Sequence, residues 1–156
     1  MHIVEHAPQP AQWHEDLRLG FEPMDDIHEE FLELVSALLG ASDEDMLEVL
    51  RALHAHSREH FAAEERWMEE TTFPAAACHR DEHAAVLASM AGVTKKVMAC
   101  DFEAGRRLAR ALAEWFPNHA DYLDSALAHW ICKKRLGGKP IVLRRTLASR
   151  ADVVSI

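Results

Sequence analysis

The chain has 156 residues, the length of one compact domain with a short extension. Hydrophobic residues make up 49% of it and charged residues 28%, so it can bury a core and is not expected to be disordered. Its net charge of −9 has the wrong sign for a protein that grips nucleic acid through phosphates, so we expect no nucleic-acid role.

The sequence pattern also predicts neither a membrane-spanning segment nor an export signal. The longest uncharged run in the apolar middle, residues 84–94, has 11 residues, whereas a bilayer span needs roughly 20. The first residues lack a basic cluster followed by an apolar stretch, so we expect a cytoplasmic protein without membrane insertion. Three cysteines without a C-x-x-C spacing favour reduced thiols over a disulfide framework.

Residues 1–22 contain Pro8, Pro10 and Gly20, which predict an irregular N-terminal arm. We expect this arm to contact the body of the protein through Trp13, Leu17 and Leu19. The first helix is expected from Pro23 to Gly40, because proline suits the first helical position and glycine a stop. Its apolar residues recur at spacings of three and four, and His28 joins that stripe, so His28 is predicted to point inward.

Three more helices are expected along the chain. Ser42 is a suitable cap for the second, which runs to about Thr71, and the third covers about residues 75–99. Asp101 caps the fourth, which reaches about Lys134. Because the connections are short, the sequence predicts an all-α fold, an antiparallel up-down-up-down four-helix bundle over residues 23–134.

Residues 135–156 form the short C-terminal extension, and the basic character begins at Lys133. From Lys133 to the end there are seven basic residues against one acid, whereas the rest of the chain is strongly acidic. Such asymmetry is typical of an interaction tail, so a protein partner is one expectation. The other, which we favour, is a solvated extension that folds back on its own acidic body.

The eleven histidines are the unusual feature of the composition, and several fall where helices can bring them together. His60 and Glu64 are four residues apart, as are His79 and His83, so each pair shares a helix face. With His28 and with His119 plus nearby acids, every helix offers ligands to one interior, which is typical of a metal site in a bundle core. These ligands outnumber the four that a zinc site takes. They favour two six-coordinate ions bridged by carboxylates, and iron is a metal that suits imidazole and carboxylate ligands.

Two other interpretations compete with this one. A metal-free core of hydrogen-bonded histidines would leave many buried polar groups to satisfy. The segment His79-Arg-Asp-Glu-His83 matches the H-x-x-E-H signature of inverted zinc peptidases, with Glu82 as general base. A short four-helix chain offers little room for a peptidase cleft, and in the bundle Glu82 would be a solvent-side acid or a partner of a ligand. A ferritin-like carboxylate site is excluded because no E-x-x-H occurs.

Between about Trp13 and Asp124 the chain resembles the hemerythrins, in particular their single-domain bacterial members. The likeness rests on motifs that occur in the family's order. They are Trp13 with Leu19-Gly20, Met24-Asp25-Asp26-Ile27-His28, His60-Phe61-Ala-Ala-Glu64-Glu65 with Met68, His79-x-x-x-His83, and Trp115-x-x-x-His119 with Asp124.

The resemblance implies a non-heme centre of two irons with an oxo or hydroxo bridge. One iron would take His79, His83 and His119. The other would take His28 and His60 and keep an open position for dioxygen, while Glu64 and Asp124 bridge the pair. Phe61, Trp115 and Phe116 would line the dioxygen pocket.

The function implied by the resemblance is reversible dioxygen binding, for storage, delivery or sensing, rather than enzymatic catalysis. An enzyme or repair protein that acts on nitric oxide, peroxide or iron clusters with the same di-iron unit is the alternative.

Two features depart from a simple match. His119 and Asp124 are five residues apart, which a regular α-helix would place about 140° apart around its axis. Pro117 cannot donate to the carbonyl of Ala113, so we expect a kink or wide turn that brings both side chains to one face. Asp121, the competing acid, would point nearly away. Phe116 and Ala120 stand where the family more often has leucine and isoleucine. We expect these two differences to change gas access, in either direction.

Overall fold

The computed structural model describes residues 11–135, so the extension from residue 136 onward and residues 1–10, with His2 and His6, lie outside the described part. Over the described residues the chain is helical, and the expected all-α fold is confirmed. The elements are η1 (Glu15–Leu17), α1 (Glu22–Gly40), α2 (Asp43–Glu70), α3 (Ala76–Met98), α4 (Phe102–His119), the π-helical turn η2 (Ala120–Asp124) and α5 (Ser125–Arg135).

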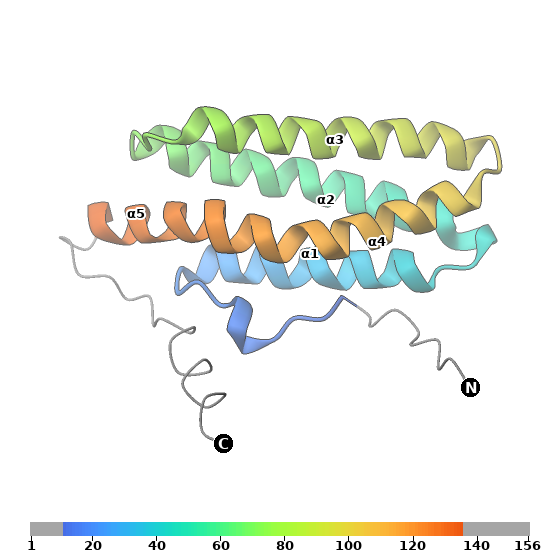
Figure 1. The fold of residues 1–156 in the computed structure, drawn as a ribbon, viewed down its shortest axis with the longest axis horizontal. Helices are drawn as coiled ribbons and strands as arrows, with labels where there is room; N and C mark the ends of the chain where they lie inside the picture. The colour runs from blue at the N-terminus through green and yellow to red at the C-terminus, as the bar shows by residue number, and fades with distance from the viewer. Residues whose placement is uncertain (1–10, 136–156) are drawn as a thin grey trace, which may run out of the picture.

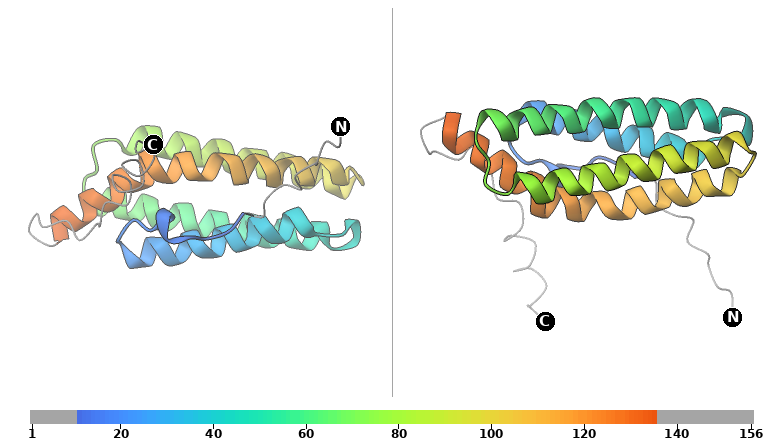
Figure 2. Two further views of the ribbon diagram at one scale, coloured as in Figure 1. Left: turned by 60° about the horizontal axis from the view of Figure 1, so that its bottom comes forward. Right: turned by 90° about the horizontal axis from the view of Figure 1, so that it is seen from above.

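The helices form an elongated four-rod bundle in which α4, η2 and α5 make the fourth rod (Figure 1). Helices α1 and α2 form one layer and α3 and α4 the other, as both views in Figure 2 show. Helix α1 packs against α2 and α4, and α3 packs against the same two helices, so each rod touches both of its neighbours. The fourth rod bends near η2, so that α5 leaves the line of α4 (Figure 2).

The helix ends follow the sequence signals. The hydroxyl of Ser42 accepts a hydrogen bond from the amide of Asp45 at 3.3 Å, and the carboxylate of Asp101 accepts one from the amide of Ala104 at 3.2 Å. Each satisfies an amide that the first helical turn leaves without a partner. Both predicted caps are therefore confirmed.

The buried side chains form two apolar clusters with a polar cluster between them along the rods. The larger apolar cluster lies toward the α1–α2 and α3–α4 connections and includes Phe31, Leu50 and Phe116. The smaller one, with Met68 and Leu127, lies at the other end. The buried histidines fall between these clusters on every rod, so apolar packing encloses them from both sides.

The described part of the N-terminal arm runs along the bundle beside α1 (Figure 1). Asp25, buried in the first turn of α1, accepts hydrogen bonds from the amides of Leu19 at 2.7 Å and Gly20 at 3.0 Å. Gly20 has a φ of 89°, a conformation that favours glycine. Leu17 and Leu19 are buried, and Trp13 packs against the larger cluster, as expected for contacts of the arm.

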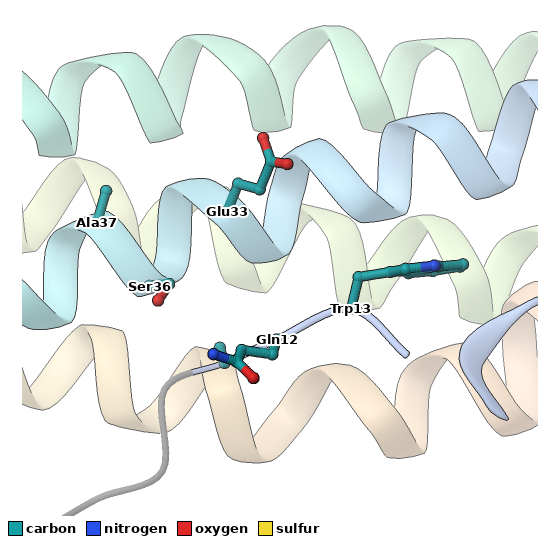
Figure 3. A pocket seen from close by; sticks show the side chains of 6 residues that line it. Gln12, Trp13, Glu33, Ser36 and Ala37 are labelled. Carbon is teal, nitrogen blue, oxygen red and sulfur yellow. The ribbon is translucent and has the colours of Figure 1, made fainter. Parts of the chain in front are cut away.

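Trp13 and Gln12 also line an open surface pocket against α1, with Glu33, Ser36 and Ala37 on the other side (Figure 3). None of the buried histidines lines this pocket. Between residues 11 and 135, no helix combines the length and the apolar character that crossing a bilayer requires.

Candidate metal centre

Seven ionisable side chains come together inside the bundle. They are all the predicted ligands, and each is at most 4% exposed. Groups of this kind are almost never fully buried unless they pair with one another or bind a metal. They come from every rod of the bundle: His28 from α1, His60 and Glu64 from α2, His79 and His83 from α3, His119 from the end of α4, and Asp124 from η2.

His79, His83 and His119 form one set, the three-histidine group. The ring centroids lie 4.5 Å apart for His79 and His83, and 5.0 Å apart for His79 and His119. His28 and His60, the two-histidine group, have ring centroids 5.2 Å apart. The structure therefore divides the five imidazoles three to two, along the line that the family resemblance implied.

Each of the two carboxylates reaches both groups with different oxygens. Glu64 Oε1 lies 2.8 Å from His60 Nε2 and 3.2 Å from His28 Nε2. Its other oxygen, Oε2, lies 3.0 Å from His83 Nε2 and 3.3 Å from His79 Nε2. A carboxylate in this position can give one oxygen to each of two neighbouring cations.

Asp124 repeats this arrangement from the other side. Its Oδ2 lies 3.1 Å from His28 Nε2, whereas Oδ1 lies 2.9 Å from His79 Nε2 and 3.2 Å from His119 Nε2. Asp121 is exposed and does not enter the cluster. The choice of Asp124 over Asp121 therefore agrees with the geometry.

The π-helical turn explains how His119 and Asp124 share a face. The amide of Ser125, at the end of η2, donates to the carbonyl of Ala120, five residues earlier. A π turn takes in one more residue than an α turn, so side chains five residues apart come to lie on one side. A wide turn is present as expected, but it begins directly after His119, and α4 remains α-helical through Pro117.

The donor atoms fit metal ions. Among the described residues, Nε2 of His79, His83 and His119 and both oxygens of Asp124 make no hydrogen bond, although they lie close together. Donor atoms from the three-histidine group, Glu64 and Asp124 lie within 4.8 Å of one another, as do those from the two-histidine group and Glu64. Imidazole with carboxylate is a donor set that suits iron.

The electrostatics show how closely these groups depend on one another. Burial would lower the pKa of His28, but the carboxylates of Asp124 and Glu64 outweigh it and raise the pKa to about 10. Burial and the neighbouring Glu64 would raise the pKa of Asp124, yet the nearby imidazoles of His28 and His119 keep it below its usual range. In the metal-free protein, protons on His28 and His79, whose pKa values are raised, therefore offset the charges of the two carboxylates.

Two acids lie outside the cluster, behind the three-histidine group. Glu82 Oε1 lies 3.1 Å from His119 Nδ1, and Glu65 Oε1 lies 3.4 Å from His83 Nδ1. The H-x-x-E-H match therefore describes two cluster histidines and an acid on the outer side of a third. Glu65 belongs to a motif that carries the family resemblance, but it was assigned no role from the sequence, because only the packing of α2 on α3 brings it to His83.

Aromatic rings surround the cluster, and the three predicted pocket residues differ in where they lie. The Phe116 ring lies 5.1 Å from the His28 ring, while the Phe61 ring lies 5.0 Å from His60 and stacks on His83 at 4.0 Å. Trp115 stacks on His119 at 4.3 Å, so it covers the three-histidine group instead. Phe31, a buried residue of α1 that was not among the predicted pocket residues, lies 5.6 Å from the His60 ring.

The other described histidines stay outside the cluster. His14 and His129 are exposed and His54 is half-buried. His56 is also half-buried, with its ring 5.6 Å from that of His60, so it borders the two-histidine group without joining it.

Comparison with known proteins agrees with this geometry. The profile of the Hemerythrin HHE cation binding domain matches residues 19–131, which contain every residue of the cluster. The chain belongs to the hemerythrin family. The resemblance to its bacterial members is thereby confirmed, because the chain is 40% identical over 123 residues to a bacteriohemerythrin of Ralstonia nicotianae, an alignment that covers 79% of this chain and 90% of that protein.

More distant members of the hemerythrin family match over a similar span. A bacteriohemerythrin of Stenotrophomonas maltophilia is 28% identical over 120 residues, covering 74% of this chain and 78% of its own. One from Pseudomonas aeruginosa is 25% identical over 122 residues, covering 72% and 79%. The likeness therefore extends over most of each chain and is not confined to the ligand motifs.

Proposed function

We propose that the chain binds dioxygen reversibly at a pair of non-heme irons, for storage, delivery or sensing. The observation that carries this proposal is that Glu64 and Asp124 each reach both histidine groups with different oxygens, inside a fully buried cluster. In this assignment the three-histidine group would hold one iron and the two-histidine group the other, with Glu64 and Asp124 within reach of both. Two bridged ferrous ions supply the two electrons that bound dioxygen takes up.

The unequal number of histidines supports gas binding on one side. The two-histidine group offers one imidazole fewer, which leaves a ligand position on its side for a small molecule. The rings of Phe116 and Phe31 lie against His28 and His60, so this side is apolar and excludes water. Because Glu64 and Asp124 are fully buried, a diatomic gas reaches the cluster more readily than a large organic substrate.

The protein residues bind and orient, and no side-chain nucleophile is needed. Nε2 of each imidazole faces the cluster, and the carboxylates hold the two groups at a fixed separation. Phe61 stacks on His83 and restricts the rotation of that ring. A rigid, dry set of ligands favours reversible binding over oxidation of a second substrate.

Metal analysis and an optical experiment test this function. We expect two irons per chain, and a reduced protein that forms a stable coloured adduct in air and loses it under vacuum. An adduct that bleaches with turnover would overturn reversible binding in favour of an enzyme or repair protein acting on peroxide, nitric oxide or iron clusters. A single zinc per chain would overturn the di-iron assignment itself.

A further inference from the structure

Glu82 makes two hydrogen bonds with one oxygen at the outer edge of the cluster. Its Oε1 accepts from the indole Nε1 of Trp115 at 3.0 Å and lies 3.1 Å from Nδ1 of His119. Glu82 belongs to α3, whereas both partners belong to α4, so the contact joins neighbouring rods. The Glu82 side chain is 45% exposed while that of His119 is 1% exposed, so the pair spans the boundary between solvent and the buried site.

This contact fixes which nitrogen of His119 carries the proton. An ionised carboxylate only accepts hydrogen bonds, so Nδ1 of His119 must be the donor. A neutral imidazole then has its lone pair on Nε2, which lies 3.2 Å from Asp124 Oδ1 on the cluster side. Glu82 therefore selects the tautomer that a metal ligand needs.

Trp115 fixes the plane of the same ring. Its indole stacks on His119 with centroids 4.3 Å apart and an interplanar angle of 29°. Because Trp115 and His119 both donate to Oε1 of Glu82, this carboxylate holds the His119 ring and the Trp115 ring in fixed positions relative to each other. Of the other cluster imidazoles only His83 has a carboxylate at Nδ1, that of Glu65 at the longer distance of 3.4 Å, whereas Nδ1 of His28, His60 and His79 makes no hydrogen bond within residues 11–135.

We propose that Glu82 is a positioning residue, which through His119 and Trp115 holds the metal of the three-histidine group more firmly than that of the two-histidine group. The proposal rests on the proposed function only for the assignment of His119 as a ligand. It gives the acid of the H-x-x-E-H segment a task other than that of a general base.

Metal release from cobalt(II)-loaded protein tests this inference without using dioxygen. A chelator is added to the wild type, Glu82→Ala, Glu82→Gln and the control Asp81→Ala, which alters the neighbouring exposed acid on α3. We expect Glu82→Ala to release one of the two cobalt ions about 10–100-fold faster, as for other partners of metal-ligating histidines. Glu82→Gln, which keeps an accepting oxygen, should fall between it and the wild type, and Asp81→Ala should match the wild type.

The same variants can be compared by proton NMR of the indole N–H groups. The chain has four tryptophans, and Trp115→Phe identifies the resonance of Trp115. Glu82→Ala should move that resonance and leave the other three in place, which also shows that the fold is intact. A Trp115 resonance that stays in place, or cobalt release from Glu82→Ala at the wild-type rate, would overturn the inference.

The outcomes for the two proposals are separable. If the iron protein fails to form a reversible adduct while Glu82→Ala still accelerates cobalt release, reversible dioxygen binding fails and the positioning role stands. If the adduct forms and Glu82→Ala releases cobalt like the wild type, the positioning role fails and the function stands.

Discussion

The two histidine groups of one cluster are held in different ways. Behind the three-histidine group lie polar partners, with Glu82 at Nδ1 of His119 and Glu65 near Nδ1 of His83. Around the two-histidine group lie the rings of Phe31 and Phe116, and within the described residues Nδ1 of His28 and of His60 has no hydrogen-bond partner. The comparison shows polar partners behind one group and apolar rings around the other, which is the difference that the proposed firm ligation on one side and open ligand position on the other would require.

The largest expected effect comes from removing the carboxylate that both groups share. Glu64→Ala takes one oxygen from each group, so we expect the iron content to fall from two per chain to one or none. Elemental analysis of the purified variant measures this. Glu69→Ala, an exposed acid on the same helix, is the matched control and should keep two irons. A Glu64→Ala protein with two tightly held irons would contradict the bridging assignment.

The metal-free protein should lose stability as the pH rises from 7 to 10. Buried carboxylates raise the pKa of His28 to about 10 and, against the effect of burial, that of His79 to about 9. A raised pKa stabilises the fold below the unfolded value of about 6.5, and this contribution is lost as the pH rises through the folded value. Each pKa unit of difference corresponds to about 1.4 kcal/mol.

Chemical denaturation at several pH values measures this loss for each group separately. His28→Gln removes the titrating ring from the two-histidine group and His79→Gln removes one from the other. Each variant should show a flatter dependence of the free energy of unfolding on pH than the wild type. An unchanged slope in both variants would contradict the proton balance within the cluster.

Phe116→Ala probes the apolar side. Phe116 is 1% exposed and packs between Phe31 and His28, so its truncation should cost about 3 kcal/mol of stability. Thermal or chemical denaturation of the metal-free variant measures this. Phe116→Leu restores much of the volume and should be milder. Glu82→Ala, on the polar side, should lower the free energy of unfolding by less than about 1 kcal/mol, because Glu82 is partly exposed. Equal losses of stability in Phe116→Ala and Glu82→Ala would contradict the contrast between the two sides.

Glu65→Ala should have the smallest effect. Its oxygen lies 3.4 Å from His83 Nδ1, a longer contact than that of Glu82, and Phe61 already stacks on the His83 ring. We expect cobalt release to accelerate only a few-fold in the chelator experiment. Cobalt release as fast as that from Glu82→Ala would contradict this ranking and give both acids the same role.

Part of the cluster could be predicted from helical periodicity, whereas Asp124 and the division of the ligands into two groups were implied by the family resemblance. His28 lies on the apolar stripe of its helix, and the spacing of four in His60–Glu64 and His79–His83 puts each pair on one face. The expected wide turn after Pro117 is also a local property, since proline removes a backbone donor wherever it lies in a helix.

The residues that periodicity did not reveal depend on contacts between segments. Asp25 looks like an ordinary acid in a first helical turn, yet it accepts hydrogen bonds from Leu19 and Gly20 of the arm. Glu82 was expected only as a solvent-side acid or a partner of a ligand, because its choice of His119 depends on how α3 packs on α4. Trp115 was expected among the pocket walls, but its ring orientation on His119 depends on the same packing.

The π turn has a consequence for everything that follows it in the chain. In a regular α-helix one inserted residue would turn the remainder of the rod by about 100° around the helix axis, and the wide π turn of η2 takes up this extra residue. The buried positions after η2, Leu127, Ala128 and Ile131, follow Asp124 at helical spacings and stay on the core side of the rod. Deleting one residue between His119 and Asp124 would let this segment close as a regular α-helix with the two side chains four residues apart on one face, whereas the same deletion elsewhere in α4 or α5 would rotate every buried position after it.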